Sequence, residues 1–280
     1  MSCPRYRASG TMRSGNRRYM KILVSNDDGI HAEGLASLCS CLTEAGFQVY
    51  VCAPDRERSA ASHALTMYSP LRLIEVGNPN FDAFRVWSAD GTPADCVKIA
   101  LELLMKSDPP DYVISGVNRG PNLGTDILYS GTVAAAAEGC FAGIPSLAVS
   151  CTDKMNPNYQ TASKFVSAHI SDIFANELPQ GTMLNINVPA DITRQVANTP
   201  YMFTRAGTMK YVDIFDVRHD PRGREYIWMS GNPMDLDIEE DFDTVAIKKG
   251  LISITPIKFD VTDYSLLAKL RNSSGGHRLL

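Results

Sequence analysis

Two adjacent aspartates, Asp27 and Asp28, are the clearest candidates for chemistry in the sequence. Neighbouring carboxylates repel each other and lose hydration when they are buried, unless a cation neutralises them. Carboxylate, amide and hydroxyl oxygens are the ligands that Mg²⁺, Mn²⁺ and Ca²⁺ prefer. The alternative is that Asn26–Gly29 forms only a turn and a helix N-cap, with Gly29 letting the chain turn sharply. The pair by itself therefore leaves both a hard-cation site and a plain turn open.

A glycine-rich loop, Gly116–Gly124, is a second candidate. Its glycines allow the backbone to approach a ligand closely, and Asn118 and Asn122 stand four residues apart, so both could face one site. The spacing matches neither the P-loop nor the dinucleotide-binding fingerprint, so no nucleotide prediction follows from it. A purely structural turn explains the same spacing equally well.

The third candidate is the start of an Ala-rich helix that we predict over Thr132–Phe141. Free N–H groups and the positive dipole at the start of a helix attract anions, and the hydroxyls of Ser130 and Thr132 would add donors. A simple Ser/Thr helix cap is the alternative in isolation. A cation site beside an anion site, however, is the minimum equipment for attack on a phosphate ester.

The aspartate pair, the loop that carries Ser59 and the glycine-rich loop each follow a predicted buried strand. These strands are expected at Lys21–Ser25, Phe47–Ala53 and Tyr112–Ser115. From about residue 20 to 190, short buried strands alternate with helices, which is typical of βαβ units. We therefore predict an α/β fold, a Rossmann-like three-layer sandwich with a mostly parallel sheet over residues 20–190. In such folds the carboxyl ends of the strands bind ligands, so these loops should meet there.

Residues 191–280 follow a different pattern, with short strand-like pieces such as Tyr226–Met229, acidic turns and a helix near the C-terminus. They predict a smaller β-rich subdomain, followed by a C-terminal helix and tail. The acidic run Asp235–Asp243 lacks the glycine of an EF-hand loop and predicts a solvated loop. Residues 1–19 lack the apolar core of a secretory signal, so we expect a disordered extension, with an organelle transit peptide as the alternative.

The composition restricts the class of protein. The chain has 280 residues, of which 44% are hydrophobic and 21% charged, as in ordinary globular proteins. The net charge is −4, but residues 1–21 hold six basic and no acidic side chains, so the rest is strongly acidic. An acidic body argues against binding to a nucleic-acid duplex, and no apolar run is long enough to span a membrane. The seven cysteines include no C-x-x-C pair, which favours buried thiols in a reducing compartment.

Taken together, the motifs resemble the SurE family (stationary-phase survival protein E) of metal-dependent nucleotidases. The resemblance extends from Lys21 to about Pro256 and is carried by the stretches KILVSNDDGIHAEGL, VCAPDRERSAASHALT, GTPADCV, PDYVISGVNRGPNLGTDILYSGTVAAAAEG, LNINVP, DPRG and ISITP. It implies a cytoplasmic phosphomonoesterase that hydrolyses nucleoside 5′- and 3′-monophosphates and short polyphosphate. It also implies homodimers or homotetramers in which the C-terminal hairpin and tail are exchanged between subunits.

The resemblance further implies which residues form the site. One divalent cation per subunit, Mg²⁺ or Mn²⁺ at a site that Ca²⁺ can also occupy, would be held by Asp27, Asp28, Ser59 and Asn118. The phosphate would be bound by Asn118, Asn122, Ser130, Gly131 and Thr132.

For the mechanism, we expect the cation to hold a water and a phosphate oxygen together, with Asp27 or Asp28 orienting or deprotonating the water. The choice between the two aspartates stays open. Asn122, Ser130 and Thr132 would act with them by stabilising charge on the phosphoryl oxygens.

The sequence leaves two rival functions open. The first is an enzyme of the haloacid-dehalogenase type, which forms an aspartyl-phosphate and uses a D-x-D motif. The residue two positions after Asp27 is Gly29, which argues against it. The second is a nucleotide-sensing stress protein that binds its ligand without turnover.

Overall fold

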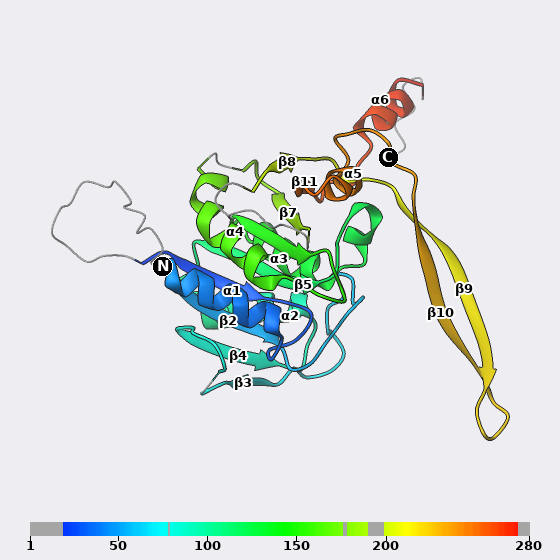
Figure 1. Ribbon diagram of the computed structural model, residues 1–280. Coiled ribbons are helices and arrows are strands. Elements are labelled where there is room, and N and C mark those ends of the chain that lie inside the picture. The colour runs from blue at the N-terminus through cyan, green and yellow to red at the C-terminus, as the bar shows by residue number, and fades with distance from the viewer. Residues whose placement is uncertain (1–18, 78, 176–177, 190–198, 274–280) are drawn as a thin grey trace.

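A computed structural model describes residues 19–273 of the chain, except for residues 78, 176–177 and 190–198. At its centre lies a sheet with the strand order β3-β4-β2-β1-β5-β6-β7-β11-β8 (Figure 1). The strands of this sheet are β1 (Lys21–Ser25), β2 (Gln48–Pro54), β3 (Leu73–Glu75), β4 (Arg85–Ala89), β5 (Tyr112–Arg119), β6 (Ser146–Cys151), β7 (Thr182–Val188), β8 (Tyr201–Phe203) and β11 (Ile252–Lys258). A separate antiparallel ribbon consists of β9 (Met209–His219) and β10 (Glu225–Asp235).

The order of the strands reverses between β1 and β5. The chain runs outward from β1 through β2 to β4 and then returns to β5 on the other side of β1, from which it continues to β6 and β7. All neighbouring pairs in this central group are parallel. Doubly wound folds bind their ligands beyond the carboxyl ends of the strands at such a reversal. The predicted Rossmann-like fold is thus confirmed, and the point of reversal lies between the first and second candidate loops.

Helices cover both faces of the sheet and make it the middle of three layers (Figure 1). On one face, α1 (Glu33–Glu44) and α4 (Tyr159–Ile173) pack on side chains such as Val24 of β1. On the other face, α2 (Pro93–Ile99) and α3 (Gly131–Phe141) pack on side chains such as Leu23. Successive residues of a strand point to opposite faces, so the apolar run of β1 supplies both cores.

Two helices have irregular neighbours. Helix α2 is followed by a π-helical turn at Ala100–Leu104, and a 3-10 segment at Gly124–Leu128 precedes α3. Thr92 caps α2, because its hydroxyl accepts from Asp95 N while the Asp95 carboxylate accepts from Thr92 N. This reciprocal pair of bonds satisfies two N–H groups that the helix itself cannot pair.

The C-terminal region departs most from the sequence prediction. The residue pattern predicts a short strand at Tyr226–Met229, and the resemblance implies a hairpin in this region. In the structure, β9 and β10 form a long ribbon that projects from the body (Figure 1). A turn at Asp220–Gly223 joins the two strands, with Gly223 N donating to Asp220 O. Polar residues interrupt the apolar pattern along both strands, and Gly231 also interrupts β10, which explains why the pattern underestimated their length. The remaining helices are α5 (Asp243–Lys248) and α6 (Tyr264–Ser273).

The prediction of a solvated loop over Asp235–Asp243 was wrong at its last residue. Asp243 is fully buried, and its carboxylate accepts hydrogen bonds from the backbone N–H groups of Gly124, Gly207 and Thr244. Burial raises the pKa of Asp243, and these N–H groups oppose the rise. The Asp243 side chain therefore connects the segment before α3 to the segment just before β9. Local sequence patterns do not predict this contact.

Further predictions concern the cysteines, membrane spans, the N-terminal extension and the division of the chain near residue 190. The six cysteines in the described ranges are free and buried, as predicted. No helix among the described residues has the length and apolar character needed to cross a bilayer. The predicted extension over residues 1–19 lies outside the described residues except for Tyr19. Strands β8 and β11, which follow residue 190, complete the main sheet beside β7, so this sheet draws on both predicted regions.

Candidate active site

The loops after β1, β2 and β5 meet at one edge of the sheet, as the parallel order requires. Arg58 N, from the loop after β2, donates to Asp27 O over 2.7 Å. Arg119 N, at the end of β5, donates to the Asp28 carboxylate over 3.1 Å. Gly29, with φ +99°, turns the chain away, and its Cα lies so close to the backbone of Arg56 that a Cβ would stand 2.9 Å from it. The aspartate pair therefore joins all three loops.

Asp27 faces the start of α3. Its side chain is 5% exposed, and its Oδ1 accepts a hydrogen bond from the hydroxyl of Thr132, which is itself fully buried. Gly131 packs directly on the same carboxylate, because a Cβ added there would stand 2.9 Å from Asp27 Cβ and 3.0 Å from Oδ2. Ser130 caps the helix by accepting from Val133 N. The predicted anion-binding turn thus lies against the predicted cation ligand.

Both carboxylates are held in an environment that disfavours negative charge. Burial raises the pKa of Asp27 to about 6, the charge of Asp28 adds to the rise, and the hydrogen bond from Thr132 opposes it. Burial also raises the pKa of Asp28, with Glu57 adding to the rise and Arg119 N–H opposing it. A positive ion between the carboxylates would reverse both effects, since an opposite charge at close range favours ionisation.

The donor atoms at this edge fit a hard divalent cation. No cluster of three or more His, Cys, Asp or Glu side chains suited to a metal occurs in the described part of the chain. The set consists instead of two carboxylates with hydroxyl and amide oxygens, which suits Mg²⁺ or Mn²⁺ better than zinc. In addition, Asn26 Oδ1 and Ser25 Oγ beside the pair are buried without a hydrogen-bond partner within the described residues.

Asn118 lies on the far side of the reversal point. Residues Asn118 and Arg119 of β5 pair with Ser150 and Cys151 of β6 after a shift in register. Such irregularities redirect side chains near functional sites. The Asn118 amide nitrogen donates to Gly120 O over 2.9 Å, a bond that leaves the amide oxygen, the atom a hard cation requires, unused.

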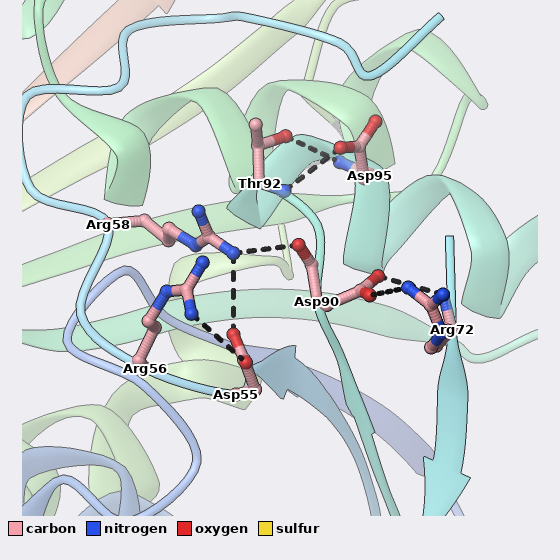
Figure 2. A network of polar contacts seen from close by, with 7 residues as sticks. All are labelled: Asp55, Arg56, Arg58, Arg72, Asp90, Thr92 and Asp95. Atoms are coloured by element: carbon pink, nitrogen blue, oxygen red, sulfur yellow. Dashed lines mark hydrogen bonds and ion pairs between the residues drawn. The ribbon is translucent and has the colours of Figure 1, made fainter. Parts of the chain in front are cut away.

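Ser59 is exposed, and the loop that carries it is held by the hydrogen bonds and ion pairs of the preceding residue, Arg58. Arg58 donates to Asp90 O over 2.7 Å and pairs with Asp55, and Asp90 in turn pairs with Arg72 (Figure 2). The Ser59 hydroxyl itself donates to Glu57 over 2.7 Å. It makes no hydrogen bond to either aspartate in the described chain, so the structure brings the Ser59 loop, but not its hydroxyl, into contact with the pair.

Asn122 is held by a buried polar network that the sequence prediction missed. Its backbone N donates to Asn187 Oδ1, and its backbone O accepts from the amides of Asn185 and Asn187, all within 3.0 Å. Its side-chain amide donates to Ser150 Oγ over 2.8 Å. The two asparagines of β7 lie in the stretch LNINVP, where their alternation with apolar residues was the available signal.

The structure brings part of the predicted set of site residues into contact. Asp27, Gly131 and Thr132 are in direct contact, and Asp28 is bonded to the strand end that carries Asn118. Asn122 is fixed by β6 and β7 and has no hydrogen bond to the aspartates in the described chain.

Comparison with known proteins matches the Survival protein SurE family over residues 22–213. The chain belongs to the SurE family. A curated relative from Pelotomaculum thermopropionicum, named 5′-nucleotidase SurE, is 50% identical over 90% of this chain and 94% of its own length. A relative of the same name from Trichormus variabilis is 45% identical over 90% of this chain and 98% of its own. The crystal structure of the SurE protein from Aquifex aeolicus matches with a TM-score of 0.76 at 32% identity, covering 91% of this chain and 99% of that one.

Proposed function

We propose that this SurE chain is a metal-dependent phosphomonoesterase that hydrolyses nucleoside 5′-monophosphates, and also 3′-monophosphates, to nucleoside and phosphate. The contact of Asp27 with Thr132 and Gly131 carries the proposal, because it joins a cation ligand to a helix N-terminus suited to phosphate. The names of the curated relatives agree with a 5′-nucleotidase. Short polyphosphate is proposed as a further substrate, since it offers the same terminal phosphoryl group.

The proposed roles follow from the atoms that each side chain offers. One divalent cation, Mg²⁺ or Mn²⁺, would be held by Asp27, Asp28, Ser59 and Asn118 and would supply Lewis-acid chemistry to a phosphoryl oxygen and to a water. The N–H groups at the start of α3, with the hydroxyl of Ser130, would bind the phosphoryl oxygens. Asp27 or Asp28 would orient the attacking water and accept its proton, which suits carboxylates whose pKa is raised.

Thr132 and Asn122 have more specific proposed roles. Thr132 donates its hydroxyl to Asp27, so it would hold this carboxylate in one orientation while its backbone N–H faces the phosphate. Asn122 would contribute the second hydrogen of its amide nitrogen, because the first is donated to Ser150.

We also propose that the protein works as a homodimer or homotetramer through residues 191–280. The β9–β10 ribbon projects from the body (Figure 1). It exposes large apolar side chains, among them Phe215, Trp228 and Met229. An isolated two-stranded ribbon is marginally stable in water, and exposed apolar surface of this kind marks contacts with other chains. The free thiols favour a reducing compartment, the cytoplasm.

The experiment is release of inorganic phosphate from 5′-AMP and 3′-AMP with Mn²⁺, with and without EDTA. We expect metal-dependent release, and a loss of several orders of magnitude in Asp27→Asn with an unchanged fold. Asp108→Asn is the matched control, because Asp108 is an exposed carboxylate that pairs with Lys21 at the opposite edge of the sheet. Absence of release above the EDTA level would contradict the proposal, and a trapped aspartyl-phosphate would replace it with the haloacid-dehalogenase chemistry.

A further inference from the structure

The loop that carries Ser59 is held in a costly backbone conformation. Ala60 and Ser62 have φ values of 55° and 51°, in the left-handed region that residues with a Cβ rarely adopt. Such a conformation is strained and persists only where the surrounding contacts fix it. The contacts made by the residues after Ser59 therefore determine the position of this loop.

These contacts tie the loop to α3 and to the segment just before it. Ser62 N donates to Tyr129 O over 3.1 Å, and its hydroxyl donates to Leu128 O over 2.7 Å. His63 Nε2 lies 2.7 Å from Glu138 Oε1, and its ring stacks on that of Phe141, with centroids 5.5 Å apart. His63 is thus the side chain through which the Ser59 loop contacts the middle and end of α3.

Glu138 is well suited to anchor the loop. It is 7% exposed and lies on the same helix whose first turn contacts Asp27. Its second oxygen, Oε2, pairs with Lys98 of α2 over 3.2 Å. Burial works to raise the pKa of Glu138, but the hydrogen bonds from His63 and Lys98 outweigh it and hold this pKa below its ordinary value. The Glu138 carboxylate is therefore ionised and nearly buried, with one oxygen bonded to His63 and the other to Lys98.

We propose that His63 is a positioning residue, which through its hydrogen bond to Glu138 holds the Ser59 loop where the Ser59 hydroxyl can ligate the cation. This inference rests on the proposed function, since Ser59 is one of its metal ligands. Some residues do not bind the metal but hold its ligands in place through hydrogen bonds. Removal of such a residue typically weakens metal binding by about 10- to 100-fold.

Lys98 provides the matched control. Lys98→Ala and His63→Ala each remove one partner from the Glu138 carboxylate, but only His63 belongs to the Ser59 loop. A purely structural role for the cluster would make the two variants equivalent. His63→Phe retains a ring to stack on Phe141 while it removes the hydrogen bond, so it isolates the proposed contact if His63→Ala folds poorly.

The test is the dissociation constant for Mn²⁺, measured from the electron paramagnetic resonance signal of the free ion, beside the melting temperature of each variant. We expect His63→Ala and His63→Phe to weaken Mn²⁺ binding about tenfold relative to Lys98→Ala. His63→Gln, whose amide can donate to Glu138, should recover most of this loss. A ratio to Lys98→Ala below about threefold, or no recovery in His63→Gln, would overturn the inference.

The wild-type protein separates this inference from the proposed function. If it binds Mn²⁺ and releases phosphate from 5′-AMP while the His63 variants match Lys98→Ala, only the role of His63 is refuted. If it binds no Mn²⁺, the proposed metal site fails and the role of His63 fails with it.

Discussion

Gly131 lies directly against Asp27, with no room for a side chain between the first turn of α3 and the carboxylate. A methyl group there would stand 2.9 Å from Asp27 Cβ and 3.1 Å from the ring of Pro93. Asp27 is also bonded to Thr132, so it cannot shift without losing that bond. The close approach of the helix to the carboxylate therefore depends on glycine at position 131.

Gly131→Ala should impair catalysis much more than it impairs folding. Alanine is favoured in helices, so the backbone gains slightly, while the displaced Asp27 should lower kcat/KM by about 100-fold, as misplacement of a catalytic group by about 1 Å can. Steady-state hydrolysis of 5′-AMP with Mn²⁺ and thermal melting measure the two effects. Gly77→Ala is the control, because a Cβ at Gly77 meets nothing within 4 Å. Equal activity in the two variants would contradict the importance of this contact.

Asn187→Ala should weaken both the fold and the site. It leaves the buried N–H of Asn122 without its acceptor, which typically costs about 1–3 kcal/mol of unfolding free energy. It also loosens the loop that carries Asn122, so kcat should fall. Urea denaturation and phosphate release are the measurements, with the exposed Asn156→Ala as the control. A variant as stable as wild type would show that the network around Asn122 contributes little.

Glu138 should make stability depend on pH at the acidic end. Because its pKa is lowered in the folded state, the stability that it contributes is present above the ordinary glutamate pKa and is lost as the pH falls through the lowered value. Glu138→Gln removes this contribution. Its unfolding free energy relative to wild type should therefore be lower at neutral pH and approach parity as the pH falls below 4.5, the ordinary value. A difference that stays constant from pH 7 to pH 3 would contradict this sign.

The exposed apolar ribbon predicts self-association. Trp228, which is 61% exposed, and Phe215 lie on paired strands of the ribbon, away from the site. Trp228→Asp combined with Phe215→Asp should shift the protein toward the monomer in multi-angle light scattering, without a change in the melting of the body. Arg218→Ala, on the same ribbon, is the control. A wild-type protein that is already monomeric would contradict the proposed oligomer.

Local patterns predicted the parts of this molecule whose causes are local. The apolar run Lys21–Ser25 and the polar residues after it are enough to predict β1 and the aspartate pair. The bond between Asn122 and Asn187 joins residues 65 apart, and that between His63 and Glu138 joins residues 75 apart. Both bonds depend on which strands and helices become neighbours in the fold. A short stretch of sequence does not carry that information. The burial of Asp243 was missed for the same reason, because its partners come from two distant segments.

The proposed function requires a divalent cation between Asp27 and Asp28, whose charge would let the two carboxylates lie side by side. Anomalous diffraction at the manganese edge, from crystals soaked in MnCl₂, tests it most directly. We expect a strong anomalous peak within bonding distance of oxygens from both aspartates, close to Ser59 and Asn118. A map without a peak there, or with both carboxylates turned toward solvent, would contradict it.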